Sequence, residues 1–277
     1  MTEALIAVSV SVVVPCYRCR RTLERAVASV AAQTALPLEV ILVDDGSLDG
    51  TREVLMALRE RHAPGWIKLV LLDKNVGAAS ARNAGWEQGA GQFIAFLDAD
   101  DSWHPRKLEL QYAFMASHPH VAVSGHRHVR ANRAAEPASL GAPAFQSLPA
   151  FYVLMKNPFI TPSFMVRREL PLRFLAGRRH MEDHLFLMQV KAAGWQIAKI
   201  NLPLAFIYKN IFGDSGLSAD LWVMQRCELD NYRLLCEQRH ISPMTFGFFK
   251  LYSWFKFFRR VVIVKCRRLT HHAHETV

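Results

Sequence analysis

The sequence predicts an α/β fold with a mostly parallel central sheet flanked by helices, followed by a C-terminal helical extension. Short β-branched runs alternate with helical patterns through the first half of the chain, which is typical of parallel sheets. Two of these runs, at 39–43 and 93–97, end directly in aspartates. Residues 219–277 keep a helical spacing of apolar side chains. Because open α/β sheets bind ligands at the carboxyl ends of their strands, the aspartates mark the expected site.

The first half of the chain alternates between β-branched runs and amphipathic or small-residue helices. The expected strands are 8–14 (ending at Pro15), 39–43, 68–72 and 93–97. The expected helices are 22–33, a helix opening at 49–51, and the small-residue helix 75–85, which Gly89 and Gly91 end. Small residues allow this last helix to lie close to the sheet or to a ligand.

The second half is less regular. A strand is expected at 121–125, and the Ala- and Pro-rich segment 131–149 is interpreted as a surface loop or lid. A helix over 183–193 ends at Gly194, and an extended segment follows over 197–207.

Composition indicates a globular chain that attracts anions. Of its 277 residues, 51% are hydrophobic, which is ample for a buried core. The formal net charge of +10 favours a phosphate-bearing ligand, a nucleic acid or an anionic membrane surface, and composition does not choose among them.

Cysteine usage and the N-terminus predict a cytoplasmic protein. The five cysteines are scattered, and the basic segment and apolar core of a secretory signal are missing. Cys16 and Cys19 form a CxxC motif, for which a redox or zinc role is the minor alternative because no second pair follows. No apolar run reaches the ~18 residues needed to span a bilayer, so no transmembrane helix is expected.

The densest candidate chemistry follows the fourth expected strand. An apolar run is followed by Asp98, Asp100 and Asp101, so carboxylates are expected at the edge of a buried sheet, where a metal-bridged diphosphate fits. The alternative is an acidic turn in which Asp101 or Ser102 caps a helix starting near Pro105.

Several segments occur together in a specific order. They are Val-Val-Val-Pro-Cys-Tyr at 12–17, Gln-Thr at 33–34, Glu-Val-Ile-Leu-Val-Asp-Asp-Gly-Ser at 39–47, Asp-Gly-Thr at 49–51, Asn-Val-Gly at 75–77, Ala-Arg-Asn-Ala-Gly at 81–85, Phe-Leu-Asp-Ala-Asp-Asp at 96–101 and Glu-Asp at 182–183. This combination resembles the non-processive bacterial family 2 inverting glycosyltransferases of the GT-A fold. The resemblance implies a GT-A domain over 1–218, with a nucleotide-binding half (7–125) and an acceptor half (126–218), before a helical extension over 219–277.

The resemblance implies a nucleotide site at the ends of the first strands. Tyr17, beside Pro15, would lie against the base, and Asp45 would accept a hydrogen bond from a uracil-like imide. Arg82 would orient the base or the acidic loops. The alternatives are a core tyrosine, a helix N-cap at Asp45 and an ordinary surface charge at Arg82.

Asp98 and Asp100 match the family's DxD motif. The resemblance assigns Asp98 to the ribose and Asp100 to a divalent cation that bridges the diphosphate oxygens. Carboxylate oxygens suit Mg²⁺ or Mn²⁺, which would offset the charge on the departing nucleoside diphosphate.

Asp183 matches the family's general base. In a single displacement this carboxylate takes the proton of the acceptor hydroxyl while the anomeric centre inverts. Glu182 is expected either to raise the pKa of Asp183 or to hydrogen-bond the local backbone. The alternative is that both acids cap the helix that follows.

The sequence departs from the family pattern at three places. Arg18 replaces an Asn that often follows the Tyr, with little effect expected on base stacking. The loop 208–218 has Lys209 for the family's Arg and no His, so a phosphate contact from Lys209 is expected and a histidine metal contact is not. No Gln-x-x-Arg-Trp motif occurs near residues 225–226, which favours transfer of one sugar per encounter.

Aromatic and basic residues interleave after Phe246. An in-plane membrane helix with its bases toward anionic headgroups fits this pattern. The alternative is a terminal helix that packs on the domain and carries a solvated basic rim. The His-His-Ala-His segment at 271–274 is interpreted as a tail, not a metal site.

The sequence therefore predicts a metal-dependent glycosyltransferase that uses a nucleotide sugar, with UDP as the expected nucleotide. The expected acceptor is a lipopolysaccharide, capsule or other glycolipid intermediate, and the expected location is the cytoplasm or the inner face of the cytoplasmic membrane. Nucleic-acid binding is disfavoured because the bases peak in a Phe-rich terminal helix. Two other classes remain as alternatives: a receiver-like signalling domain ending near residue ~130, and a catalytically silent membrane-surface adaptor on the same fold.

Overall fold

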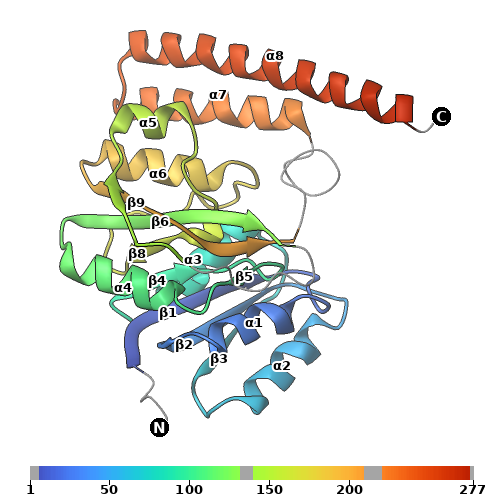
Figure 1. Ribbon diagram of the computed structural model, residues 1–277, viewed down its shortest axis with the longest axis vertical. Coiled ribbons are helices and arrows are strands. Elements are labelled where there is room, and N and C mark those ends of the chain that lie inside the picture. The colour runs from blue at the N-terminus through green and yellow to red at the C-terminus, as the bar shows by residue number, and fades with distance from the viewer. Residues whose placement is uncertain (1–5, 132–139, 209–219, 275–277) are drawn as a thin grey trace. The chain divides into compact units, whose positions relative to one another are not determined.

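The computed structural model describes residues 6–131, 140–208 and 220–274, the last eleven of these as backbone only. The chain forms two compact units, Met1–Tyr208 and Lys209–Val277. The first unit holds a nine-stranded sheet in the order β3-β2-β1-β4-β8-β6-β9-β5, with β7 paired to β9 (Figure 1). The strands are β1 (Ile6–Cys16), β2 (Ala35–Asp45), β3 (Ile67–Leu72), β4 (Phe93–Phe96), β5 (Ser102–Trp103), β6 (Val121–Arg130), β7 (Phe145–Ser147), β8 (Met165–Arg167) and β9 (Gln196–Ile207).

Helices connect most of these strands. Those of the first unit are α1 (Leu23–Ala31), α2 (Thr51–Arg61), α3 (Ala78–Gln88), α4 (Lys107–Ser117), α5 (Ala150–Met155), the short 3-10 helix η1 (Thr161–Ser163) and α6 (Glu182–Ala192). The alternation expected from the sequence is present from β1 to β4.

The strands of the N-terminal half are parallel. β1 lies between β2 and β4, and β3 continues the sheet beyond β2. The register pairs Cys16 with Asp44, so the carboxyl ends of β1 and β2 lie at one edge. β1 continues through Pro15 instead of ending there, because Pro15 lies beyond the last β4 partner at Val13, where a missing N–H costs no ladder bond to β4.

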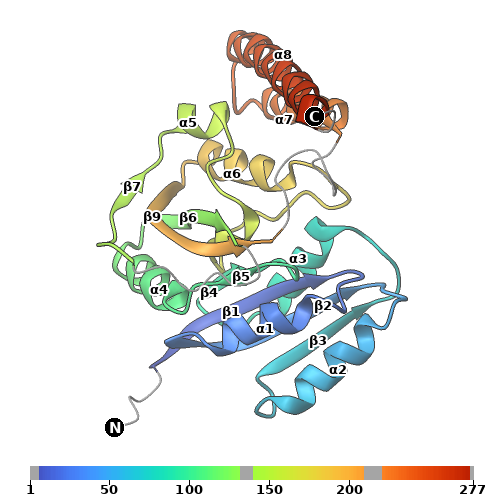
Figure 2. The ribbon, with the colours of Figure 1, turned by 45° about the vertical axis from the view of Figure 1, so that its right-hand side comes forward.

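The two faces of this parallel region pack against different helices. Val12 and Val14 belong to the core formed with α1, α2 and α4. Val13 and Val43 face α3, where a Cβ on Gly85 would lie 2.4 Å from Val13 and 3.0 Å from Val43. Gly85 therefore lets α3 approach the sheet closely, as the small-residue pattern predicted. Figure 2 shows α1 and α2 on one side of the sheet and α3 on the other.

Beyond β4 the sheet becomes mixed. β8 runs antiparallel to β4 and β6, while β6 and β9 are parallel. β5 and β7 each run antiparallel to β9. The prediction of a loop throughout 131–149 is wrong at β7, a three-residue strand whose exposed side chains give no alternating pattern. Residues 132–139 of that segment lie outside the described chain.

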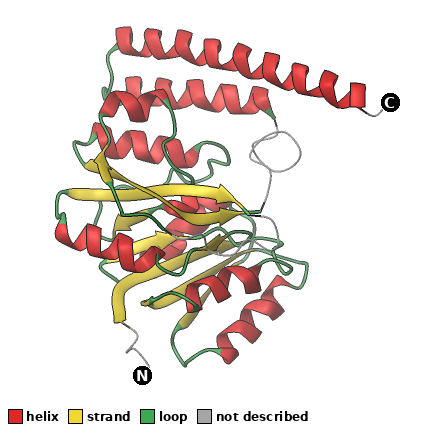
Figure 3. Ribbon diagram, in the orientation of Figure 1, coloured by secondary structure: helices red, strands yellow, loops and turns green. Residues whose placement is uncertain are grey.

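The described part of the second unit consists of two helices, α7 (Leu221–Glu237) and α8 (Pro243–His274), which lie side by side (Figure 3). α7 begins after Asp220, whose side chain accepts hydrogen bonds from the N–H groups of Trp222 and Val223. The helical extension is confirmed. Of the helices that the structure describes, none combines the length and apolarity needed to cross a membrane.

Candidate functional site

The loop that follows β1 presents an aromatic ring to solvent. Tyr17 is 43% exposed. Arg18 has a left-handed backbone (φ 49°), and its N–H donates to Ser47 Oγ at 3.1 Å, which ties this loop to the one after β2. The Arg18 guanidinium carbon lies 5.2 Å from the centroid of the Tyr17 ring. The alternative of a core tyrosine is wrong. The Arg18 guanidinium lies within cation–π range of the ring, and its small expected effect on base stacking stays a prediction.

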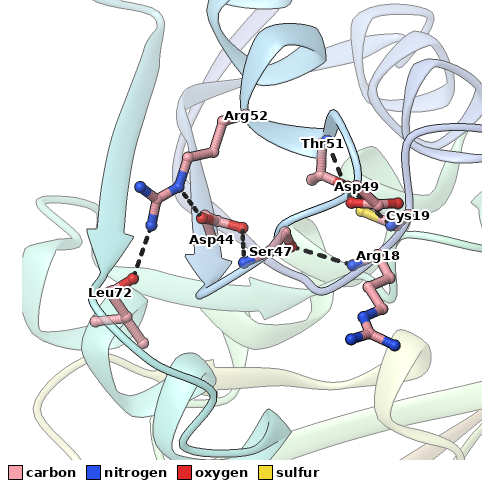
Figure 4. A network of polar contacts seen from close by, with 8 residues as sticks. All are labelled: Arg18, Cys19, Asp44, Ser47, Asp49, Thr51, Arg52 and Leu72. Atoms are coloured by element: carbon pink, nitrogen blue, oxygen red, sulfur yellow. Dashed lines mark hydrogen bonds and ion pairs between the residues drawn. The ribbon is translucent and has the colours of Figure 1, made fainter.

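The loop that follows β2 is fixed by a buried carboxylate (Figure 4). Asp44 Oδ1 accepts from the Ser47 N–H at 3.1 Å, and Oδ2 accepts from Arg52 Nε at 2.6 Å. Arg52 also donates to the Leu72 carbonyl at 3.0 Å, so α2 and β3 hold the same turn. Asp44 therefore fixes the conformation of the loop after β2, whereas Asp45 binds the backbone just before α3.

Asp45 holds the start of α3. Its Oδ1 accepts from the Val76 N–H at 2.7 Å, and its Oδ2 accepts from the Gly77 N–H at 2.9 Å. Gly46 is left-handed (φ +68°), and a Cβ there would lie 2.7 Å from the Lys74 carbonyl carbon, so only glycine allows the two loops to meet. The alternative of a helix N-cap at Asp45 is wrong, because neither α2 nor α3 has a side-chain cap hydrogen bond and the two N–H groups belong to the residues just before α3. Each oxygen still has a lone pair for a ligand N–H.

Asp98 and Asp100 lie in the turn between β4 and β5, where both side chains are partly exposed. The Asp101 N–H donates to the Asp98 carbonyl at 3.0 Å and closes the turn. α4 starts only at Lys107 with Arg106 at its N-cap position, so the alternative in which Asp101 or Ser102 caps this helix is wrong.

Arg25 supports this turn and was missed by sequence reasoning. Its Nη2 donates to the Asp100 carbonyl oxygen at 2.5 Å, across 75 residues of chain. Its guanidinium carbon lies 3.6 Å from the centroid of the Tyr208 ring, and the Tyr208 hydroxyl lies 3.0 Å from Ser102 Oγ. In sequence, Arg25 is indistinguishable from an ordinary surface charge on the helix α1, so the local pattern does not predict its contacts.

Arg82 joins the two halves of the first unit. It is 4% exposed, its Nη1 donates to Glu182 Oε1 and its Nη2 donates to Asp98 Oδ1, both at 2.8 Å. The surface-charge alternative is wrong, because Arg82 is buried and pairs with an acid on each side. Its expected role in orienting the base or the acidic loops stays a prediction. Burial raises the pKa of Asp98, the nearby Asp100 charge adds to this, and Arg82 opposes it.

Asp183 is positioned by the first turn of α6. Met181, just before this helix, has a left-handed backbone (φ 54°) that is unusual for a non-glycine residue. Asp183 Oδ1 accepts from the His184 N–H, and Oδ2 accepts from Asn157 Nδ2, both at 2.7 Å. Asp183 therefore satisfies one backbone N–H in the first turn of α6 through Oδ1, as the capping alternative expects. Its Oδ2 instead binds a residue that is distant in sequence. Sequence reasoning missed Asn157, whose only signal is a lone amide opening an apolar segment.

Burial and charge raise the pKa of Asp183 to about 7. Burial is the larger cause and the Glu182 charge is the second, while the His184 hydrogen bond, Arg82 and Asn157 oppose them. The expectation that Glu182 raises this pKa is confirmed. A carboxylate that titrates near neutral pH suits general base chemistry.

The acidic turn fits a hard divalent cation. Among the described residues, no group of three or more His, Cys, Asp or Glu is arranged to hold a metal ion unaided. Mg²⁺ and related ions commonly take one or two carboxylates together with substrate phosphates. Asp100 offers one such partly exposed carboxylate on this turn, whereas Asp98 Oδ1 accepts from Arg82. Lys209, the expected phosphate contact, lies outside the described residues.

The CxxC pair shows free thiols. Cys16 is buried and Cys19 is partly buried, and neither is in a disulfide. Burial raises the pKa of Cys16, which disfavours its reactive thiolate form.

Comparison with known proteins decides the family. The family model described as glycosyl transferase family 2 matches residues 11–173, more than half of the chain. The chain belongs to glycosyl transferase family 2. Its match to the succinoglycan biosynthesis protein ExoO of Rhizobium meliloti is 32% identical over 257 residues and covers 84% of this chain and 72% of that protein.

Other relatives match over a shorter stretch. The Escherichia coli enzyme WfgD, a UDP-Glc:alpha-D-GlcNAc-diphosphoundecaprenol beta-1,3-glucosyltransferase, is 38% identical over 106 residues, which are 38% of this chain and 40% of that protein. The chain thus spans well under half the length of several curated relatives that it matches.

Solved structures confirm the GT-A fold. The crystal structure of S. aureus TarS residues 1–349 in complex with UDP-GlcNAc superposes with a TM-score of 0.66 at 22% identity, over 82% of this chain and 65% of that chain. The receiver-like alternative is wrong, because the family match and the continuous sheet both extend beyond residue 130.

Proposed function

We propose that this family 2 glycosyltransferase moves a sugar from a nucleoside-diphosphate donor, with UDP as the expected nucleotide, to an acceptor hydroxyl with inversion. The observation that carries the proposal is the Arg82 bridge between Asp98 and Glu182, both at 2.8 Å. Through it, the acidic turn expected to face the donor is tied to the helix turn that carries Asp183. The donor and base functions thereby share one rigid connection.

The nucleotide would lie at the carboxyl edge of β1 and β2. Tyr17, next to Pro15, offers an exposed ring for base stacking. Asp45 offers a fixed carboxylate for the N–H of a uracil-like base. Asp98 is assigned to the ribose, and Lys209 is assigned to the phosphates.

Asp100 would hold Mg²⁺ or Mn²⁺ with the diphosphate. When bound, such a cation offsets negative charge on the leaving nucleoside diphosphate. The contribution of the chain is to present the carboxylate on a turn held by Arg25. Restricting the turn lowers the entropy lost when donor and cation bind.

Asp183 would act as the general base. Its carboxylate takes the proton of the acceptor hydroxyl as the oxygen bonds to the anomeric carbon and the bond from that carbon to the diphosphate breaks. With a pKa of about 7, it is ionised in a large fraction of molecules at neutral pH and is basic enough to accept the proton. Asn157 and the His184 N–H hold the carboxylate in place.

The acceptor would be an envelope glycan or a glycolipid intermediate, at or near the inner face of the cytoplasmic membrane. This rests on the relatives: ExoO is named for succinoglycan biosynthesis, and WfgD for a diphosphoundecaprenol-linked acceptor. Residues 126–218 would form the acceptor half.

A thermal-shift panel of nucleoside diphosphates with and without Mn²⁺ tests the donor site. A nucleotide at about a hundredfold excess over its Kd should raise the Tm by about 5 °C. Asp100→Ala should lose the Mn²⁺-dependent part, whereas Asp230→Ala, an exposed α7 carboxylate, should keep it. No shift with any nucleotide, or equal shifts in Asp100→Ala, would contradict the proposal. A nucleotide shift without any turnover would favour the silent-adaptor alternative.

A further inference from the structure

Helix α8 has one face that packs against α7. Phe249, Ser253 and Phe257 are at most 2% exposed. Ser253 Oγ donates to Glu228 Oε2 at 2.9 Å, and Lys256 forms an ion pair with the same α7 carboxylate. The ring of Phe249 stacks on Tyr232 with centroids 5.2 Å apart. This face is therefore already used within the unit.

A different face of α8 exposes a continuous apolar row. Its members are spaced by alternating steps of four and three residues, which keeps them on one side of a helix. Each is between 53% and 86% exposed. We call this row the α8 apolar stripe, and it consists of Met244, Phe248, Leu251, Phe255, Phe258 and Val262.

The charge of α8 is of one sign. Over Pro243–His274 the helix carries seven Lys and Arg residues and no Asp or Glu. Lys250 and Arg259 are exposed within the same length of helix as the stripe. The sequence left open whether this helix meets a membrane or packs on protein. In the structure one face of α8 packs on α7, and a different face exposes the α8 apolar stripe.

The stripe has the 4–3 spacing of a coiled-coil seam, so a second copy of the chain is the competing occupant. Pairing two α8 helices would bring two all-cationic helices side by side, with no acid on either to offset the repulsion. An anionic bilayer supplies both an apolar layer and negative headgroups. The charge pattern therefore favours lipid.

We propose that α8 lies in the plane of an anionic lipid surface, with the α8 apolar stripe at the acyl boundary and the exposed bases at the phosphate headgroups. α7, on the opposite side, remains in water. The inference goes beyond sugar transfer and does not depend on the donor site. It does bring the chain to the surface where a lipid-linked acceptor would be found.

Co-sedimentation of the full chain with vesicles tests the stripe. The chain should sediment with phosphatidylglycerol-containing vesicles and remain in solution with pure phosphatidylcholine. Phe248→Ser with Phe255→Ser should lower the binding constant by at least about tenfold, since each loses an inserted apolar side chain. The matched control, Leu38→Ser with Met56→Ser, alters two exposed apolar residues of the first unit and should bind normally. Equal binding by the stripe variant would overturn the proposal.

A charge-reversal pair tests the headgroup contact. Lys250→Glu with Arg259→Glu should lower binding to the anionic vesicles by at least about tenfold, while the control Arg59→Glu with Arg168→Glu should have a much smaller effect. Equal loss in both pairs would mean unspecific attraction and would overturn the assignment to α8. A concentration-dependent dimer in sedimentation velocity, abolished by the stripe substitutions, would assign the stripe to a second copy instead. Every variant should keep its nucleotide thermal shift, which separates failure of this inference from failure of the donor site.

Discussion

Replacing Glu182 by Gln should lower the pH at which the enzyme becomes active. The Glu182 charge is the second-largest cause that raises the pKa of Asp183 to about 7, after burial. Gln keeps an oxygen that accepts from Arg82 Nη1, so the bridge retains its shape. Only the negative charge is removed. The ionised form of Asp183 then becomes more favourable, and its pKa falls.

The size of the shift follows from Coulomb's law. For two carboxylates about 6 Å apart at an effective dielectric constant of about 20, the repulsion is about 3 kcal/mol, or about two pKa units. Arg82 lies 2.8 Å from Glu182 and offsets much of that charge. We therefore expect about half of the full effect, a fall of about one unit.

The assay is the pH dependence of kcat/KM for release of the nucleoside diphosphate from a nucleotide sugar, with water as the acceptor. Activity falls on the acid side as the base takes up a proton, so the wild-type acid limb should lie near pH 7. In Glu182→Gln it should lie near pH 6. An acid limb that stays in place, or moves upward, would refute the assignment of the limb to Asp183 and Glu182.

Three further substitutions test the same network. Asn157→Ala removes a hydrogen bond that lowers the pKa of Asp183, so the acid limb of the pH profile should move upward by about half a unit, and an unchanged limb would count against a positioning role for Asn157. Asp183→Asn should abolish turnover yet bind nucleotide normally. Because the folded-state pKa of Asp183 lies above its ordinary value, its ionisation destabilises the folded state, and this destabilisation is absent near pH 4 and complete above pH 7. The variant should therefore be more stable than wild type by about 2–4 kcal/mol at pH 8 but not at pH 4 in denaturant titrations. Arg82→Met leaves Asp98 and Glu182 without their shared cation and should lower the free energy of unfolding by about 3 kcal/mol, whereas a loss below about 1 kcal/mol would mean that the bridge does not hold the two halves together.

The fold follows closely from local patterns. The strands before Asp45 and Asp98 are apolar because both faces of a parallel sheet are covered, and this covering makes them recognisable in sequence. The same logic fails at β7, whose three side chains are exposed and carry no pattern. β1 is also longer than expected, because Pro15 lies where no β4 partner needs its N–H.

The candidate site was predictable only in part. Motif spacing identified Asp98, Asp100 and Asp183, whose proposed roles remain predictions. It did not reveal Arg25 or Asn157, because their contacts with Asp100 and Asp183 depend on how distant segments meet. The sequence singled out Arg82, but its hydrogen bond to Glu182 joins residues 100 positions apart and could not be predicted from local patterns.

The stereochemistry of donor hydrolysis tests the central claim most directly, and it needs no knowledge of the acceptor. The enzyme is incubated with Mn²⁺ and a panel of α-linked nucleotide sugars, and the anomer of the released sugar is followed by proton NMR before it mutarotates. A single displacement with Asp183 as base predicts that the β anomer appears first and that Asp183→Asn releases none. First release of the α anomer, or unchanged release by Asp183→Asn, would contradict the mechanism.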